Sequence, residues 1–268
     1  MLISVIIRSI GRDVIFRAIK SLENQTFKDF EIIVVEDGSD ILQDKIHTNL
    51  NIRYFSSSEK IGRSAAGNLG MAMANGKYLI FLDDDDEFLP NHLESLCNIV
   101  NETTIAASLV YEVGESERGK IKTPRYTLYG KYNKQDILYK NILPINAVLF
   151  PKSLFTNYGG FDTDLDALED WVLWAKYLKH INLAYSNIGS AIYYVPFSLK
   201  KYFSRRKIIK IHYTKAAQRV KEIYGSQNAH QKSSKIHRLK DILIKINMLF
   251  KLVFYRAVGI TNYIIKGF

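Results

Sequence analysis

A single cysteine, Cys97, is all that this chain of 268 residues contains. One thiol excludes a disulfide framework and a metal site built from several cysteines, and it is typical of a reducing compartment. The first residues, 1–13, lead directly into a strand pattern with no basic segment before a long apolar stretch, so we expect no signal peptide. Hydrophobic residues make up 47% and aromatic residues 12% of the chain, which excludes a disordered protein and favours one large folded domain with appendages.

Acidic residues are almost missing from the end of the chain. Residues 199–268 hold 17 Lys and Arg against 2 Asp and Glu, whereas residues 1–198 hold 20 against 25. From Ile236 onward apolar residues recur on one helical face between Lys and Arg, and no uncharged run there approaches the ~20 residues that span a bilayer. We expect a basic amphipathic helix that lies on an anionic membrane surface. The alternative is packing on the rest of the chain or on a second copy in a homodimer; nucleic-acid binding is disfavoured because no known binding module is recognisable.

Buried strands alternate with helices over the first eighty residues, as in a βαβ unit. Continuous apolar runs rich in β-branched residues predict strands buried on both faces, and apolar residues at helical spacing predict the intervening helices. The expected strands are residues 2–7, 30–36, 52–55 and 78–82, and the expected helices are residues 13–24 and 63–74. The second helix is rich in Ala and Gly, so we expect it to pack close to the sheet.

The last of these strands runs directly into four adjacent carboxylates, Asp83–Asp86. Adjacent carboxylates repel one another and are expensive to bury unpaired, so the run indicates a hard divalent cation such as Mg²⁺ or Mn²⁺. An exposed acidic turn that caps a helix at Pro90 is the alternative. Ligands of open α/β sheets lie beyond the carboxyl ends of the strands, so we expect Arg8-Ser9 and Glu36-Asp37 to converge on the same crevice.

A nicotinamide-type dinucleotide site is excluded by the turn after the first strand. Such a site needs G-x-G-x-x-G there, so that pyrophosphate can approach the backbone. Residues 8–13 contain one glycine.

A second acidic pair, Glu169-Asp170, opens a predicted helix far along the chain. Acidic residues in a first turn are favoured by the helix dipole, so capping and catalysis are both open for this pair. Trp171, which follows Asp170, could stack on a sugar or belong to the hydrophobic core, and both roles are open. Between the two acidic groups we expect a helix, a strand, an irregular charged loop and an apolar segment, at residues 93–100, 105–113, 114–133 and 146–150. The uncharged residues 181–199 predict strands and turns.

Taken together, several segments resemble the family 2 glycosyltransferases of the GT-A fold. They stand in the family's order and roughly its spacing, and they are SVIIRSIGR (4–12), QTFKDFEIIVVEDGSD (25–40), GRSAAGNLG (62–70), GKYLIFLDDDDEFLP (76–90) and GGFDTDLDALEDWVLW (159–174). The resemblance implies an α/β fold with a Rossmann-like, mostly parallel central sheet flanked by helices, here with a C-terminal basic helical extension. We expect a nucleotide-sugar-binding half at residues 1–115, an acceptor-binding and catalytic-base half at 116–200, and the tail at 201–268.

The resemblance also implies roles for individual residues. Asp170 would be the catalytic base, supported by Glu169 and Trp171 near the acceptor, and Asp85 would be the direct ligand of Mn²⁺ or Mg²⁺ on the donor diphosphate. Asp83 would lie near the ribose and the metal, and His212 is a further candidate near the metal or the diphosphate, although a surface histidine is the alternative. The remaining residues expected to bind the nucleotide-sugar are Ser9, Asp37, Arg63 and Asp84.

Two positions depart from the family pattern. The usual first-strand P-T-Y-N is Arg8-Ser9-Ile10-Gly11 here, and the usual A-R-N is Ala66-Gly67-Asn68. The first change loses the proline and the aromatic residue, and the second loses an arginine, while Arg63 remains. These changes bear on base recognition, for which uridine is favoured.

The implied activity is an inverting transfer of a hexose from a nucleotide-diphospho-sugar to a hydroxyl of a glycan or a lipid-linked acceptor. An acceptor hydroxyl needs a general base and a diphosphate leaving group needs a cation, and the sequence offers one carboxylate group for each task. We expect a place at the cytoplasmic face of the inner membrane, in O-antigen or capsule assembly. The alternative is a non-catalytic nucleotide- or glycan-binding protein on the same fold.

Overall fold

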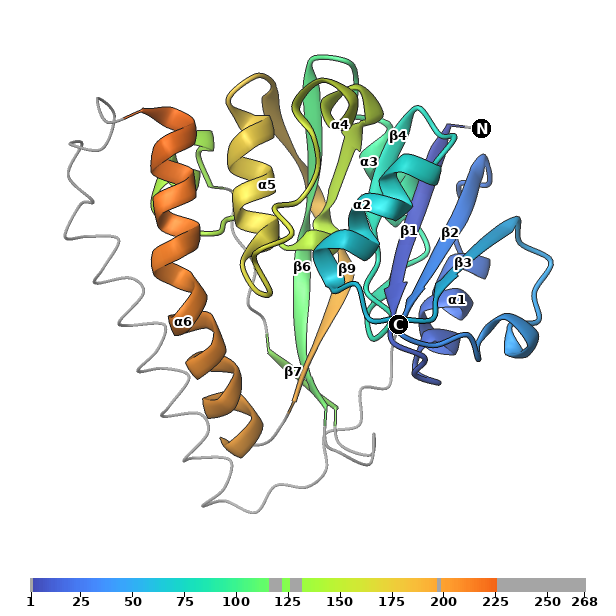
Figure 1. Ribbon diagram of the computed structural model, residues 1–268. Coiled ribbons are helices and arrows are strands. Elements are labelled where there is room, and N and C mark those ends of the chain that lie inside the picture. Colours follow the sequence, from blue (N-terminus) through green and yellow to red (C-terminus); the bar gives the residue numbers. More distant parts are fainter. Residues whose placement is uncertain (1, 116–121, 126–131, 197–198, 226–268) are drawn as a thin grey trace, which may run out of the picture. The chain divides into compact units, whose positions relative to one another are not determined.

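The computed structural model describes residues 2–115, 122–125, 132–196 and 199–225, all of which belong to one compact unit, Met1–Ser226 (Figure 1). The amphipathic stretch expected from Ile236 lies outside the described residues, so its membrane and dimer roles remain predictions.

Four parallel strands form the first half of the central sheet. They lie in the order β3-β2-β1-β4 and comprise β1 (Ile3–Ser9), β2 (Phe30–Asp37), β3 (Ile52–Ser57) and β4 (Tyr78–Phe81). All residues of β1, β2 and β4 are buried, as the continuous apolar runs predict. In the parallel register Ser9 lies opposite Glu36 and Ile6 opposite Phe81, so the carboxyl ends of β1, β2 and β4 reach the same edge of the sheet.

Two helices connect these strands: α1 (Ile15–Glu23) and α2 (Arg63–Met73). The small residues of α2 allow the close approach that the sequence predicts. A Cβ atom on Gly70 would collide with the side chain of Ile6 in β1, and one on Gly67 would lie 2.6 Å from the ring of Phe161. The start of α2 is thereby held near the end of β1.

The second half of the sheet changes strand direction. β8 (Val148–Pro151) pairs antiparallel with β4, and β6 (Thr104–Glu115) pairs antiparallel with β8. β9 (Asn182–Pro196) runs parallel to β6 with register shifts near Leu109, and β5 (Glu87–Phe88) pairs antiparallel with β9. The expected strands and turns at residues 181–199 are therefore one long, irregular strand. The segment 114–133 is less irregular than expected, because β7 (Lys122–Arg125) pairs with the end of β6.

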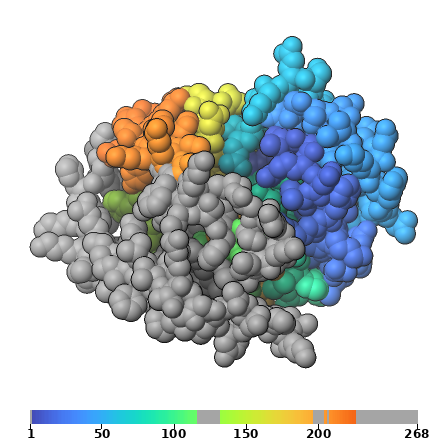
Figure 2. Space-filling view, turned by 90° about the horizontal axis from the view of Figure 1, so that it is seen from below, coloured from blue at the N-terminus to red at the C-terminus, as the bar shows by residue number. Residues whose placement is uncertain are grey.

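The remaining helices complete the described unit. They are α3 (His92–Cys97), α4 (Lys152–Tyr158), α5 (Glu169–Leu178), α6 (Leu199–Tyr224) and the 3₁₀ turns η1 (Gln43–Lys45), η2 (Lys134–Leu138) and η3 (Ile145–Ala147). Figure 2 shows α6, in orange, beside the yellow segment that includes α5, and the ring of Tyr213 on α6 lies 5.5 Å from that of Trp171 on α5. In the part of the chain that the structure describes, every helix is too short or too polar to cross a bilayer.

Candidate active site

One residue separates the acidic run from the end of β4, and the run contacts two side chains from the end of β1. The Arg8 guanidinium donates to Oδ1 of Asp83 from Nη2 at 2.6 Å and from Nε at 3.1 Å. The hydroxyl of Ser9 donates to Oδ2 of Asp84 at 2.7 Å. The adjacent ends of β1 and β4 thus join, as expected from the strand pattern.

Arg12, in the turn after β1, contacts two of the carboxylates. It forms an ion pair with the buried Asp84, and its Nη2 lies 3.3 Å from Oδ2 of Asp85. The Asp85 side chain remains 39% exposed. Burial of the carboxyl group, together with repulsion from Asp83, raises the pKa of Asp85 above its ordinary value, and Arg12 offsets only part of this. Asp85 is therefore a carboxylate with an accessible oxygen and incomplete charge compensation.

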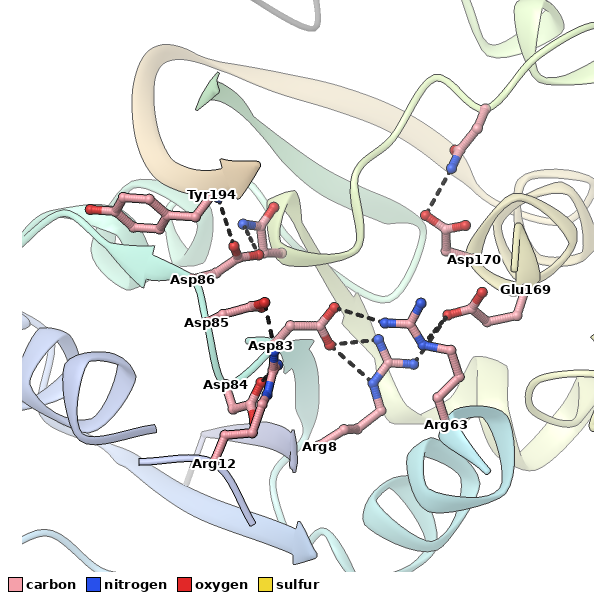
Figure 3. A network of polar contacts seen from close by, with 12 residues as sticks. Arg8, Arg12, Arg63, Asp83, Asp84, Asp85, Asp86, Glu169, Asp170 and Tyr194 are labelled. Atoms are coloured by element: carbon pink, nitrogen blue, oxygen red, sulfur yellow. Dashed lines mark hydrogen bonds and ion pairs between the residues drawn. The ribbon is translucent and has the colours of Figure 1, made fainter. Parts of the chain in front are cut away.

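Two arginines connect this acidic run to the first turn of α5 (Figure 3). Besides its contact with Asp83, Arg8 places Nη1 at 3.4 Å from Oε1 of Glu169. Arg63, the first residue of α2, lies 3.4 Å from Oδ2 of Asp83 and 3.3 Å from the same Glu169 oxygen. Burial favours the neutral form of Asp83, but the charges of Arg8 and Arg63 outweigh it and lower the pKa of that carboxyl. Asp83 and Glu169, 86 positions apart, are thus bridged twice.

Asp170 lies beside this network, pointing away from Glu169. Its Oδ2 accepts a hydrogen bond from Nδ2 of Asn141 at 2.8 Å, and its Oδ1 accepts one from the amide of Trp171 at 2.9 Å. Burial, followed by repulsion from Glu169, raises the pKa of Asp170 to about 7, while the two hydrogen bonds and the charge of Arg63 act in the opposite direction. A carboxyl group with this pKa exchanges a proton near neutral pH, which is what a general base requires.

The charges in this network do not cancel. Its cations are Arg8, Arg12 and Arg63, and its acids are Asp83, Asp84, Asp85, Glu169 and Asp170, so three positive charges face five acidic groups. Asp85 and Asp170 are the two of these acids whose pKa values are raised: Asp85 shares Arg12 with Asp84, and Asp170 accepts its side-chain hydrogen bond from the neutral Asn141.

The acidic run suits a divalent cation in one specific way. Among the described residues no three His, Cys, Asp or Glu side chains are grouped as ligands of one ion. Mg²⁺ is commonly held by one or two carboxylates together with substrate phosphates, which needs no larger protein cluster. The half-exposed Asp85 oxygen, with its uncompensated charge, fits that arrangement, and Asp83 is the second expected ligand.

Other expected site residues hold backbone turns. Asp37, at the end of β2, accepts hydrogen bonds from the amides of Ile61 at 2.6 Å and Gly62 at 3.0 Å, and so fixes the turn that leads into Arg63. Glu36 faces the loop after its own strand and accepts from the amides of Ile41 and Leu42, both at 3.1 Å. The Tyr54 hydroxyl on β3 also donates to Glu36. The expected convergence of the Glu36 side chain with the acidic run is therefore wrong, because its carboxylate is held by the loop after β2 and by β3.

Trp171 lies in the core, and His212 lies on α6. Trp171 is 1% exposed, and its indole N–H donates to the carbonyl of Ile137 at 2.6 Å, so it fills the core instead of presenting a face to a sugar. His212 lies half-buried on α6, which packs against α5 and η2.

Sequence reasoning assigns no role to three residues of the network, Arg8, Arg12 and Asn141, although it places Arg8 at the crevice. Their contacts depend on how the strands are ordered, which local patterns do not encode. For Arg8 a signal exists, since a charged residue that ends a strand buried on both faces needs a partner. Asp86 is a fourth case: it is fully buried and accepts from the amide of Tyr194 and from Nδ2 of Asn146, both at 3.0 Å, and burial raises its pKa well above the ordinary value.

The fold and the site together define an α/β protein of the glycosyltransferase type, with acidic groups at the carboxyl end of a mixed sheet. Residues 4–153 match the family model described as Glycosyl transferase family 2, which covers more than half of the chain. The chain belongs to this family.

Individual relatives support the same assignment. A Campylobacter jejuni protein named GalNAc(5)-diNAcBac-PP-undecaprenol beta-1,3-glucosyltransferase is 40% identical over 107 residues, 37% of this chain and 35% of the relative. An uncharacterized glycosyltransferase of Rickettsia typhi is 32% identical over 185 residues, 63% of this chain and 56% of that protein. The chain thus spans less than two thirds of the length of these curated relatives.

A solved structure shows the same fold. The crystal structure of S. aureus TarS 1-349 in complex with UDP-GlcNAc has a TM-score of 0.58 and 17% sequence identity, covering 87% of this chain and 74% of that chain. The expected α/β fold class is confirmed by this likeness and by the family match.

Proposed function

We propose that this protein is an inverting glycosyltransferase that moves a hexose from a nucleotide-diphospho-sugar to a hydroxyl of a glycan or lipid-linked acceptor. The observation that carries the proposal is the double bridge that Arg8 and Arg63 form between Asp83 and Glu169, the chain neighbours of Asp85 and Asp170. It brings the two acidic segments into one region of the protein, and the pKa values of Asp85 and Asp170 are both raised there. Burial beside a second carboxylate raises the pKa of Asp170 to about 7, which suits a general base and favours an enzyme over a non-catalytic binding protein.

In this reaction the acceptor oxygen attacks the anomeric carbon from the face opposite the diphosphate. The new C–O bond forms as the glycosidic bond to phosphate breaks, Asp170 takes the hydroxyl proton, and the nucleoside diphosphate leaves with the bonding electrons. A positioned base contributes roughly 10²–10⁴-fold to such a step. Direct displacement by the acceptor inverts the anomeric centre.

Mn²⁺ or Mg²⁺ would be held by Asp85, with Asp83 beside it. Bound there, a divalent ion offsets the negative charge that develops on the leaving diphosphate. Ser9, Asp37, Arg63 and Asp84 would bind the nucleotide part of the donor, and Glu169 would support the acceptor side.

The donor and acceptor classes are supported by relatives. The solved complex of TarS contains UDP-GlcNAc, and the name of the Campylobacter relative specifies a glucosyl acceptor linked to undecaprenol through a diphosphate. We infer a UDP-sugar donor and a lipid-linked glycan acceptor for this chain, in the assembly of a surface polysaccharide such as O-antigen or capsule.

A peripheral position on the inner face of the cytoplasmic membrane is consistent with such an acceptor. Helix α6 carries nine Lys and Arg against one Glu, and exposes Ile208 and Ile211 between them. Basic residues near a bilayer are attracted to anionic lipids.

The test is nucleoside diphosphate release from a panel of nucleotide-sugars by the full-length chain, with Mn²⁺ and with excess chelator. We expect one donor to be turned over only when the metal is present. Asp170→Asn and Asp85→Ala should each lower the rate by about 10²-fold or more. Asp164→Asn, which removes a surface partner of Lys215 and Arg219, serves as the control that keeps the rate. Wild-type rates in both site variants would contradict the mechanism, and donor binding without turnover would favour the binding protein.

A further inference from the structure

Arg8 is a buried cation with partners on two separate elements. The side chain is 5% exposed, and its guanidinium contacts Asp83 after β4 and Glu169 at the start of α5. Its carbon Cζ also lies 5.3 Å from the ring centre of Phe81 and 5.5 Å from that of Phe161. Aromatic faces on two sides and carboxylates at both ends fix the plane of the guanidinium, which suits its flat, forked set of donors.

The two departures from the family pattern lie next to each other in space. A Cβ atom on Gly67 would lie 3.4 Å from Cδ of Arg8 and 2.6 Å from the ring of Phe161. The volume beside α2 where an arginine at position 67 would begin is therefore filled by the Arg8 side chain and the Phe161 ring. The chain lacks an arginine on α2 at this point and supplies one from the end of β1.

The first turn of α5 needs an external restraint. Leu168, the residue before Glu169, has φ 62° and ψ 18° and is the single non-glycine residue with positive φ among those that the structure describes. The left-handed region is unfavourable for a residue with a Cβ atom, so such a conformation persists where surrounding contacts over-determine it. Arg8 holds the Glu169 side chain from the buried side, and Arg63 holds it from the exposed side, where 48% of the Arg63 side chain is accessible.

We propose that Arg8 is a positioning residue: it locks the strained first turn of α5 against the end of β4 and thereby sets the place of Asp170 relative to Asp83 and Asp85. Arg8 takes over a position beside α2 that Gly67 leaves without a side chain. The consequence for catalysis rests on the proposed function, whereas the lock itself is a property of the protein without substrate.

Hydrogen exchange of the substrate-free full-length protein tests the lock. In Arg8→Met, which keeps an unbranched apolar chain, we expect amides of residues 168–173 to exchange at least about tenfold faster than in the wild type. Arg8→Lys should also exchange faster, because one ammonium group lacks the fork that reaches both carboxylates. Unchanged exchange in this segment in Arg8→Met would overturn the proposal, whatever the enzyme does with a donor.

The matched control is Arg53→Met. Arg53 likewise pairs with a buried carboxylate, Glu31 at 3.5 Å, and lies 5.5 Å from the ring of Phe55, but on β3 and away from α5. We expect Arg53→Met to lower the melting temperature while exchange at residues 168–173 and turnover stay as in the wild type. Faster exchange there in Arg53→Met as well would show general loosening and would overturn the specific role of Arg8.

Kinetics then separate positioning from loss of folded protein. A displacement of the base by about 1 Å costs roughly 10²-fold in rate, so we expect that loss of kcat in Arg8→Met. In the background of Glu169→Ala the same change should cost less than about threefold, because the acceptor oxygen of the link is already absent. Equal losses of kcat in both backgrounds would overturn the bridge between these residues. Absence of turnover with every donor in the wild type would reject the proposed function and leave the exchange result standing.

Discussion

Asn141 controls the proton affinity of the proposed base through one hydrogen bond. Its Nδ2 donates to Oδ2 of Asp170 at 2.8 Å, which stabilises the ionised carboxylate and lowers a pKa that burial and Glu169 hold at about 7. In Asn141→Ala this donor is absent, so burial and repulsion from Glu169 still raise the pKa of Asp170 while the Asn141 hydrogen bond no longer lowers it. The pKa of Asp170 should therefore rise.

The size of the change follows from the strength of the bond. A hydrogen bond to a charged group contributes about 1.5–3 kcal/mol, and one pKa unit corresponds to about 1.4 kcal/mol, so the pKa should rise by about one to two units. A base is active when deprotonated, so activity increases with pH through this pKa. At pH 7 the wild type is about half ionised and the variant roughly a tenth to a hundredth, which predicts a loss of about five- to fiftyfold that disappears at high pH.

The measurement is the initial rate as a function of pH from about 5.5 to 10, at saturating donor and Mn²⁺. A saturating concentration of Mn²⁺ keeps Asp85 ionised, so that its own protonation does not add to the pH dependence. Asn141→Asp removes the same N–H and adds a like charge, so its acid limb should lie at least as high as that of Asn141→Ala. An acid limb that stays near pH 7 in both variants, or that moves to lower pH, would show that Asp170 is not the group whose ionisation limits the reaction.

Three further outcomes concern stability and the tail. Burial lowers the pKa of His92 to about 3. Between about pH 6.5 and pH 3 the imidazole is therefore protonated in the unfolded chain but neutral in the folded chain. Stability should fall between these pH values, by up to about 5 kcal/mol, and His92→Phe should show a shallower acid limb in chemical unfolding. The variant should lose some stability at neutral pH because the 2.8 Å contact with Ser190 is lost. Gly76→Ala should lower the free energy of unfolding by more than about 2 kcal/mol in the same measurement, because its Cβ atom would lie 2.5 Å from the backbone nitrogen of Ser4; an unchanged value would refute this contact. A chain ending at residue 230 keeps α6 but lacks the amphipathic stretch from Ile236, so it should bind anionic liposomes more weakly than the full chain in flotation. Unchanged binding would favour packing of the tail on protein.

Much of the sheet follows from patterns visible in the sequence. Apolar runs rich in β-branched residues predict β1, β2 and β4 to within two residues, since a strand buried on both faces leaves no room for polar side chains. The acidic run and the Glu169-Asp170 pair are likewise found at the ends of regular elements, as the sequence predicts. Local periodicity and the placement of charge after a strand carry this information.

The remaining features depend on contacts between distant parts of the chain. The Asn, Ser, Gly and Pro residues of β9 predict several strands with turns, whereas the structure accommodates them in one strand whose register against β6 shifts. The charged residues around β7 predict a loop instead of a strand. The functions of Arg8 and Asn141 require knowing that α5 lies beside the ends of β1 and β4, which no local pattern encodes. The predictions for Glu36 and Trp171 fail for another reason. A carboxylate or an indole ring that could bind a ligand can equally well be buried with hydrogen-bond partners inside the protein, and the sequence does not distinguish the two cases.

The contact between Arg8 and Glu169 spans 161 positions of the chain. During synthesis on the ribosome, the amino-terminal strands are therefore made long before the partner of this arginine exists. Closing so long a loop is slow compared with pairing neighbouring strands. The acidic groups that define the site would thus come together in one of the last steps of folding, and a nascent chain released before α5 would contain the parallel strands without a working centre.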